Sequence, residues 1–476
     1  MGREIRSERF TTRDFQRFAE HLRQETDLLE AWCRDGRLAA GGPAAGFELE
    51  AWLVDADGRP AARNAELLAA LGDAPAVPEL SRFNIEINTP PRPLRGEVFS
   101  AMHADLAATL ARCEAAGAPL GLRLATVGIL PTVREEDLVL ANMSDRVRFR
   151  ALNAQVLRLR RGRPIELDIA GRERLRTTHH DVMLEAATTS FQIHLQVDPG
   201  EAQRCYNAAV IAAGPMVAAS ANSPFLFGRD LWDETRVPLF EQSVNTEGGG
   251  APGRNPNRVT FGEDYARGGL PGLFRENLER FPVLLPALLD EPPEALAHLR
   301  LHNGTIWRWN RPLVGFDARG RPQLRIEHRV VPAGPSAADA LANAALFYGL
   351  VAHLARQSPA PEARLPFAAA RANFYRAARH GLAAELAWWE GGRRPAARLL
   401  AEWGCPAARE GLAALGVAAA DIERYLGIIE QRVAAGRNGA AWQRAWRARH
   451  GPDMGALTLA YLARQHDDRP VHQWTL

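Results

Sequence analysis

The sequence predicts an α+β protein, in which an antiparallel sheet has helices on one face and polar side chains on the other, followed by a C-terminal helical lobe. Three observations lead to this prediction. Four short segments alternate apolar and polar residues, which is the period of a strand with two different faces. The stretches 11–33, 97–116 and 201–220 are typical of helices. After Pro335 the chain becomes rich in Ala, Leu and Arg at helical spacing.

The four alternating segments differ from ordinary solvated strands in what their polar sides carry. In Gly46–Val54 the polar positions are Glu48 and Glu50, and in Phe83–Thr89 they are Asn84, Glu86 and Asn88. In Ser190–Val197 they are Gln192, His194 and Gln196, and in Leu324–Val330 they are Arg325, Glu327 and Arg329. One such strand taken alone is more often just a solvated face. Paired in one sheet, the four would gather acids, an imidazole and guanidinium groups on a single surface.

Such a surface favours a divalent metal site. Carboxylates that are packed together repel and raise each other's pKa, and a divalent cation removes that penalty. An oxygen-rich set with one imidazole suits Mg²⁺ or Mn²⁺ and does not suit structural zinc. Metal ions of this kind can hold phosphate oxygens during phosphoryl transfer. The sequence therefore predicts a Mg²⁺ (or Mn²⁺) cluster on the polar face.

Composition excludes several classes of nucleotide-using protein. All 58 basic residues are arginine, and the chain has no lysine. Walker A loops, protein kinases and pyridoxal enzymes each need a lysine, so all three are excluded. Any ATP would be held by metal ions and by arginine, whose planar fork binds phosphate oxygens in pairs. The net charge of +2 gives no reason to expect nucleic acid or a membrane as a partner.

The N-terminus and the cysteines favour a cytoplasmic location. The first residues, MGREIRSERFTTRDF, have no apolar core, so we expect no signal peptide. No apolar run approaches the ~20 residues that span a bilayer. The four cysteines lie far apart without a CxxC motif, so we expect reduced thiols with no role in the chemistry. The sequence is compatible with a homo-oligomer but does not define the oligomeric state.

Two further stretches bear on function. Asn245–Gly269 is rich in Gly, Pro and Asn, and a loop of that length is often a lid. We expect it to order over a bound nucleotide. His179 and His180 are adjacent and could suggest a metal site, but we interpret them as loop or helix-end residues and not as metal ligands.

Six segments resemble, in order, the motifs of carboxylate–amine ligases of the glutamate–cysteine ligase type. They are GFELE at 46–50, ELSRFNIEINTPP at 79–91, FQIHLQV at 191–197, ANSPFLFG at 221–228, TIWRWNRP at 305–312 and LRIEHR at 324–329. Each motif is short, but six in the family's order are specific. The resemblance implies a glutamine-synthetase-like sheet shaped as a funnel, with ATP at its mouth. It ends near residue 335, so we expect a catalytic domain at 1–335 and a helical lobe at 336–476 packed on it.

The resemblance also implies the site residues. Glu50, Glu79 and Glu86 would hold one Mg²⁺ beside the amino-acid substrate, and Glu48, His194 and Glu327 would hold another beside the ATP phosphates. Glu79 needs a turn or bulge to face the site, because its parity differs from that of Glu86. We assign Arg311 and Arg329 as catalytic groups on phosphate or substrate carboxylate, and Arg236, Gln192 and Asn88 as binding residues. Trp307 and Trp309 either line the substrate pocket or pack in the hydrophobic core.

The implied reaction has two steps. A carboxylate, for which we expect the γ-carboxylate of glutamate, attacks ATP and gives an acyl phosphate, and an amine then displaces phosphate to form an amide. The substrates are thus an amino acid and an amine. The WRWN segment replaces the family's usual tryptophan–acid pattern, which leaves the acceptor amine undefined. A guanidino-phosphotransferase of the same fold and a non-catalytic nucleotide-binding relative stay open as alternatives.

Overall fold

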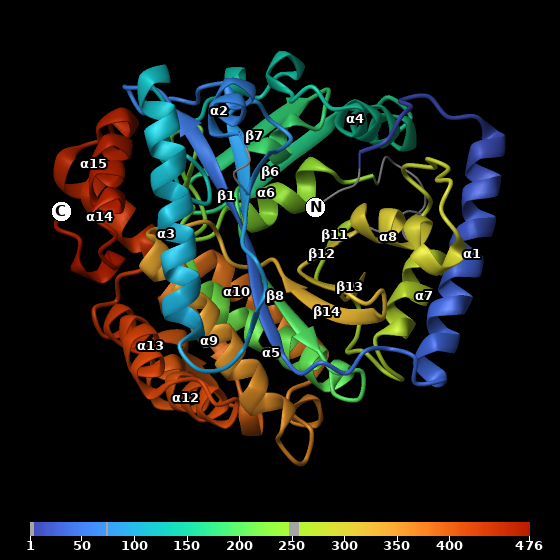
Figure 1. Ribbon diagram of the computed structural model, residues 1–476. Helices are drawn as coiled ribbons and strands as arrows, with labels where there is room; N and C mark the ends of the chain where they lie inside the picture. Colours follow the sequence, from blue (N-terminus) through green and yellow to red (C-terminus); the bar gives the residue numbers. More distant parts are fainter. Residues whose placement is uncertain (1–3, 73–74, 247–256) are drawn as a thin grey trace.

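The computed structural model describes residues 4–72, 75–246 and 257–476, and it confirms the predicted fold class (Figure 1). An antiparallel sheet has the strand order β13 (Asn310–Phe316), β14 (Pro322–His328), β8 (Phe191–Val197), β1 (Ala44–Val54), β3 (Asn84–Asn88) and β2 (Ala76–Pro78). Two short strands, β4 (Arg92–Pro93) and β5 (Arg123–Ala125), also pair with β1. All four alternating segments are therefore neighbours in one sheet.

The register of the sheet aligns the polar positions of adjacent strands. Three cross-strand pairs result, namely Glu327 with His194, Glu48 with Gln192, and Glu50 with Glu86. Because side chains alternate along a strand, residues that are paired directly across strands project from the same face. The period of two in the sequence thus produces one continuous polar face.

Helices cover the apolar face of the sheet. Figure 1 shows α3 (Val98–Gly117), α9 (Ala337–Ala355) and α13 (Ala419–Ala434) on one side of β1, and α5 (Ala202–Ser220) packs on β13 and β14. The Tyr348 hydroxyl of α9 lies 3.0 Å from the carbonyl oxygen of Gly46 and 2.9 Å from that of His194. This contact anchors α9 to the two strands that carry the metal-site candidates.

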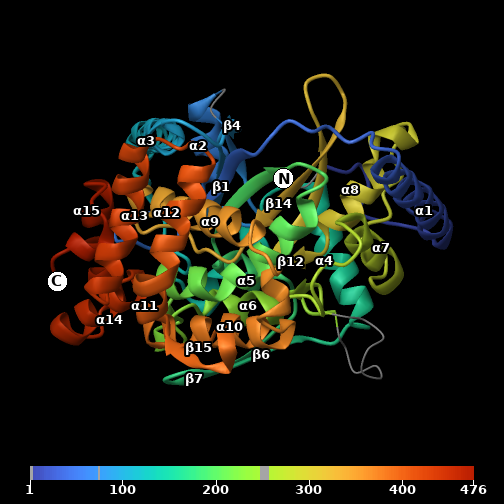
Figure 2. The same cartoon turned by 90° about the horizontal axis from the view of Figure 1, so that it is seen from below.

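Other helices face the polar side. Figures 1 and 2 show α1 (Thr12–Arg34), α7 (Pro271–Arg280) and α8 (Ala297–Gly304) together across from the sheet, with α4 (Val147–Leu159) beside them. A capping box formed by Thr11 and Asp14 begins α1. A buried pair, in which His298 Nδ1 lies 2.6 Å from Glu25 Oε1, joins α8 to α1. These helices enclose the polar face.

The C-terminal part is mostly helical. Beyond α9 it contains α10 (Phe367–His380), α11 (Ala396–Leu399), α12 (Cys405–Ala414), α13, α14 (Gly439–His450) and α15 (Met454–His466), with one hairpin of β15 (Glu385–Ala387) and β16 (Arg393–Pro395). The Ser336 side chain caps α9 by accepting a hydrogen bond from the Asp339 N–H. Among the described helices only α9 is long and apolar enough to cross a bilayer, yet 89% of that stretch is buried inside the protein. A domain boundary near residue 335 stays a proposal, since α5 packs against both α9 and α10.

Several elements differ from the sequence prediction or extend it. The hairpin of β6 (Ile165–Ala170) and β7 (Arg174–His179) was not predicted, and His179 ends a strand, so its interpretation as a loop or helix-end residue is wrong. Within the expected lid, residues 247–256 lie outside the described residues, and β11 (Val259–Thr260) pairs in parallel with β12 (Trp307–Arg308). The lid stays a prediction. The remaining short elements are α2 (Asn64–Leu71), β9 (Phe225–Leu226), β10 (Arg229–Asp230) and α6 (Arg236–Ser243).

A buried acid behind the sheet gives a pH-dependent prediction. Glu241 Oε1 on α6 accepts hydrogen bonds from Trp309 Nε1 (2.9 Å) and the Tyr375 hydroxyl (2.8 Å). Burial raises the pKa of Glu241 to about 7. An acid whose pKa is raised by folding contributes stability that is present below its unfolded pKa and is lost as pH rises through its folded pKa.

We therefore expect Glu241→Gln to flatten the pH dependence of stability. Between pH 5 and pH 8 the wild type should lose up to ~3 kcal/mol that the variant, which is neutral throughout, does not lose. Thermal unfolding across this range measures the difference. The exposed Glu136→Gln should behave as wild type. Parallel curves for wild type and Glu241→Gln would contradict the role of this acid.

Candidate active site

The polar face of the sheet lines a pocket of about 520 Å³. The other walls come from α4, α8, β12 and the 3₁₀ turn Met183–Ala187. Nine of the eleven candidate residues line it, namely Glu48, Glu50, Glu79, Glu86, Gln192, His194, Arg311, Glu327 and Arg329. Trp307 also lines the pocket, whereas Trp309 is 1% exposed and belongs to the core. The sheet thus concentrates the predicted chemistry in one cavity.

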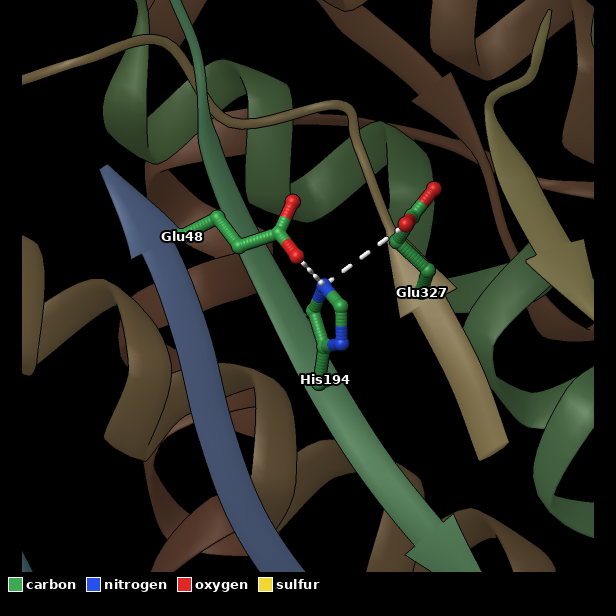
Figure 3. Close-up of side chains that lie close together, drawn as sticks. All are labelled: Glu48, His194 and Glu327. Carbon is green, nitrogen blue, oxygen red and sulfur yellow. Dashed lines mark ion pairs between the residues drawn. The ribbon is translucent and has the colours of Figure 1, made fainter. Parts of the chain in front are cut away.

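The first acid cluster combines Glu48, His194 and Glu327 from three neighbouring strands (Figure 3). His194 Nε2 faces both carboxylates, at 3.7 Å from Glu48 Oε1 and 3.6 Å from Glu327 Oε1. This nitrogen is buried and has no hydrogen-bond partner in the described part of the chain. Burial lowers the pKa of His194, although both carboxylates act against the shift. The neutral imidazole that results is the form that binds a metal.

Two arginines converge on Glu327. Arg311 donates to both of its oxygens, from Nε (2.8 Å) and Nη2 (3.0 Å), and Arg329 Nη1 donates to Oε2 at 3.0 Å. Burial alone would raise the pKa of Glu327, but Arg311 and Arg329 hold it well below the usual range. Arg329 Nη1 also donates to Gln192, while its Nε has no hydrogen-bond partner within the described ranges. Arg329 therefore has an N–H that is available to hydrogen-bond a ligand. Arg311, by contrast, mainly neutralises the charge of Glu327.

The second acid cluster contains Glu50, Glu79 and Glu86. Each offers a carboxylate oxygen, and these oxygens lie within 4.8 Å of one another. Burial and the charge of Glu79 raise the pKa of Glu50 to about 7. Burial, Glu48 and Glu79 raise the pKa of Glu86 well above its usual value. The repulsion predicted from the sequence is present, and a hard divalent cation fits this all-oxygen donor set.

Hydrogen bonds orient the second cluster. Glu50 Oε2 accepts from the Ser190 N–H (2.6 Å) and Oε1 from Gln192 Nε2 (2.7 Å). Gln192 thereby connects the two clusters, since its amide oxygen accepts from Arg329. Glu79 lies in the connection between β2 and β3, where the Asn84 N–H donates to the Ser81 carbonyl (3.2 Å). This turn explains how Glu79 reaches the site although its parity differs from that of Glu86.

Two candidate residues do not line the pocket. Arg236 is 2% exposed and donates to Glu234 and to the carbonyl oxygens of Arg329 (3.2 Å) and Val330 (2.7 Å). The guanidinium of Arg236 is thus used to hold the end of the strand that carries Arg329, and its expected role in substrate binding stays a prediction. Asn88 Nδ2 donates to Glu86 Oε1 at 3.0 Å, so it orients a metal-site candidate from outside the pocket.

Sequence reasoning missed four charged residues of the pocket as site candidates. They are Arg148, Glu185, Arg300 and Arg325. Glu185 lies in the 3₁₀ turn before β8, outside the six motifs, so no local signal marked it. Arg325 lies on the polar face of β14, and its alternation with Glu327 and Arg329 was the available signal.

The cysteines lie elsewhere. None of the four lines the pocket. Burial raises the pKa of Cys33 and Cys113 to about 11 and that of Cys205 and Cys405 to about 12. Thiols with such values stay protonated at neutral pH and are poor nucleophiles. Their expected lack of a role in the chemistry stays a prediction.

Comparison with known proteins gives one family. The family model of the glutamate-cysteine ligase family 2 (GCS2) matches residues 44–461. No curated protein sequence matches the chain. Similar solved structures include a glutamate–cysteine ligase from Francisella tularensis in complex with AMP, with 11% identity, a TM-score of 0.48, and 90% of this chain and 93% of that chain covered.

Two further solved structures are similar at comparable identity. A bifunctional glutathione synthetase from Pasteurella multocida has 10% identity and a TM-score of 0.49, with 93% of this chain and 55% of that chain covered. The ligase PafA, in its complex with the prokaryotic ubiquitin-like protein Pup, has 10% identity and a TM-score of 0.38, with 89% and 72% covered. The family model, by contrast, spans most of the present sequence. The chain therefore belongs to glutamate-cysteine ligase family 2, a family of carboxylate–amine ligases.

Proposed function

We propose that the protein is an ATP- and Mg²⁺-dependent ligase that joins the γ-carboxylate of glutamate to an amine through an acyl phosphate. The observation that carries the proposal is the meeting of two acid clusters and two arginines in one pocket. Such a pocket suits phosphoryl transfer, where catalysis is mainly positioning and charge neutralisation. Membership of the family supports the reaction class. We also propose a cytoplasmic location.

The two clusters have separate roles in this proposal. Glu50, Glu79 and Glu86 would hold one Mg²⁺ near the carboxylate substrate, and the cluster of Glu48, His194 and Glu327 would hold another near the ATP phosphates. Bound Mg²⁺ supplies positive charge that offsets the carboxylates and the phosphates. The fit rests on the oxygen-rich donors and on His194 Nε2, which makes no hydrogen bond to any described residue.

The arginines act on the transferred group. Arg329 would contact the γ-phosphoryl group with its remaining N–H, while Gln192 and Glu327 fix its orientation. Arg311 would keep Glu327 ionised and in place. The substrate carboxylate attacks the γ-phosphorus and ADP leaves, after which the amine attacks the acyl carbon and phosphate leaves.

We expect the purified protein to form γ-glutamyl hydroxamate and ADP from ATP, L-glutamate and hydroxylamine, and to stop doing so after chelation and gel filtration. Addition of Mg²⁺ or Mn²⁺ should restore the reaction. A screen of amino acids and amines, with products identified by mass spectrometry, then defines the natural substrates. A phosphorylated guanidine without any amide would favour the guanidino-phosphotransferase alternative. Nucleotide binding without turnover on every substrate would favour the non-catalytic alternative.

A further inference from the structure

The pocket contains one acid that neither metal cluster uses. Glu185 lines the pocket from the 3₁₀ turn Met183–Ala187. Its side chain makes no hydrogen bond or ion pair with any described residue. It also lies outside the group of Glu50, Glu79 and Glu86, whose oxygens converge within 4.8 Å. Glu185 is therefore an acid of the substrate pocket that no hydrogen bond or ion pair of a described residue satisfies, although Glu79, Glu50 and Arg329 act on it electrostatically.

The turn that carries Glu185 is held firmly. The Val182 N–H donates to Asn153 Oδ1 of α4 (3.1 Å), and the Met183 N–H donates to Asp181 Oδ1 (2.9 Å). The Glu185 carbonyl accepts from the Thr188 N–H at 2.9 Å. These bonds fix the backbone on both sides of Glu185, so its carboxylate is presented from a rigid support, as a binding residue requires.

The chemistry of the reaction limits which group could pair with Glu185. ATP, the attacking carboxylate and the acyl phosphate are all anionic, and a carboxylate would repel each of them. The metal positions have their own converging donors. Of the groups in the proposed reaction, this leaves the primary ammonium groups as partners for Glu185. They occur on the acceptor amine and on the α-carbon of an amino-acid donor. On α4, next to the anchored turn, Phe149 and Leu152 add apolar contacts to the pocket.

We propose that Glu185 is the ammonium-binding residue of this pocket and takes the –NH₃⁺ group of a substrate. The proposal rests on the ligase function proposed above and adds to it the recognition of a cationic substrate group. It places Glu185 in direct contact with substrate, through a charge-assisted hydrogen bond.

A two-by-two substrate experiment tests the proposal with Glu185→Gln. The donor is either L-glutamate or glutarate, which lacks the α-ammonium group but keeps the reacting carboxylate. The acceptor is either n-butylamine, which is cationic at neutral pH, or hydroxylamine, which is uncharged. We expect kcat/KM to fall by about 10- to 100-fold for the combination that presents the bound ammonium group, the loss typical of a hydrogen bond to a charged group.

The pattern of losses identifies the source of the ammonium group. A loss that disappears with hydroxylamine supports the proposal with the acceptor as the source. A loss that disappears with glutarate supports it with the donor as the source. An equal loss in all four combinations, accompanied by a higher Mg²⁺ requirement, would show a metal or structural role and overturn the proposal, and so would unchanged kinetics in all four.

Two further variants control for folding. Glu185→Asp keeps the charge on a shorter side chain and should recover part of the activity. Asp181→Ala removes the acceptor of the Met183 N–H without altering the pocket lining, so it should lower the melting temperature without any dependence on the substrate pair. A wild-type enzyme without ATP-dependent product in any combination would instead refute the proposed ligase function, which is a separate outcome.

Discussion

Glu86→Gln should make the metal-free protein more stable at high pH while removing most of its activity. The raised pKa of Glu86 means that its ionisation costs stability as pH rises through that value, because burial, Glu48 and Glu79 all disfavour the charge. Glutamine keeps the shape and can still accept the Asn88 hydrogen bond, but it never ionises. At pH 9 and without metal, we expect the variant to unfold at a higher temperature than the wild type.

The same substitution removes one of the three proposed metal ligands of the second acid cluster. With Mg²⁺ present, we expect kcat to fall by about 10²–10³-fold, the loss seen when one group that stabilises the transition state is removed. The rise in melting temperature on adding Mg²⁺ should also be smaller than in the wild type. Thermal unfolding at pH 6 and pH 9, with and without Mg²⁺, measures both effects.

A surface substitution serves as the matched control. Glu66→Gln on α2 removes an exposed carboxylate paired with Arg63 and should leave kcat and the Mg²⁺ response unchanged. A Glu86→Gln enzyme with wild-type Mg²⁺ response would show that this acid is not a ligand. Glu327 is a poorer probe, since neutralising it leaves Arg311 and Arg329 as buried cations, a loss of about 3–5 kcal/mol.

Arg329→Lys should lower kcat by about 10²–10³-fold and change the KM for ATP only a few-fold. Lysine keeps the charge but loses the planar fork, so it cannot contact Glu327, Gln192 and a phosphoryl oxygen together. An interaction made mainly in the transition state affects kcat more than binding. Steady-state kinetics, nucleotide affinity and melting temperature, measured on the same preparation, separate these effects.

Arg236→Lys is the natural control for Arg329→Lys. It makes the same chemical change at a buried arginine that donates to Glu234 and to backbone carbonyls behind the pocket. We expect a lower melting temperature and a much smaller loss of kcat per folded enzyme than in Arg329→Lys, because Arg236 hydrogen-bonds only to the backbone of Arg329. If Arg329→Lys shows this structural pattern as well, then Arg329 supports the strand and does not act on phosphate.

The sequence predicted those site residues that lie on strands, where side-chain direction repeats every two residues. A strand fixes the direction of every second side chain, so Glu48, Glu50, Glu86, His194 and Glu327 could be placed on one face before any pairing was known. Their clustering then followed once the strands were neighbours in one antiparallel sheet. The helices were predicted in the same way from their own spacing of about 3.6 residues per turn.

By itself, then, the sequence predicted the sheet, its polar face and the acids within strands, and from these acids came the proposal of a divalent cation. Only the tertiary structure decided how Glu79 reaches the second cluster, that Glu185 enters the pocket, that Arg311 pairs with Glu327 and that Arg236 stays behind the wall. The physical reason is that side chains in turns do not point in directions that repeat along the sequence. A long arginine side chain, in addition, binds whichever carboxylates and carbonyl oxygens folding brings near it. Those partners come from distant parts of the chain, which no local pattern records.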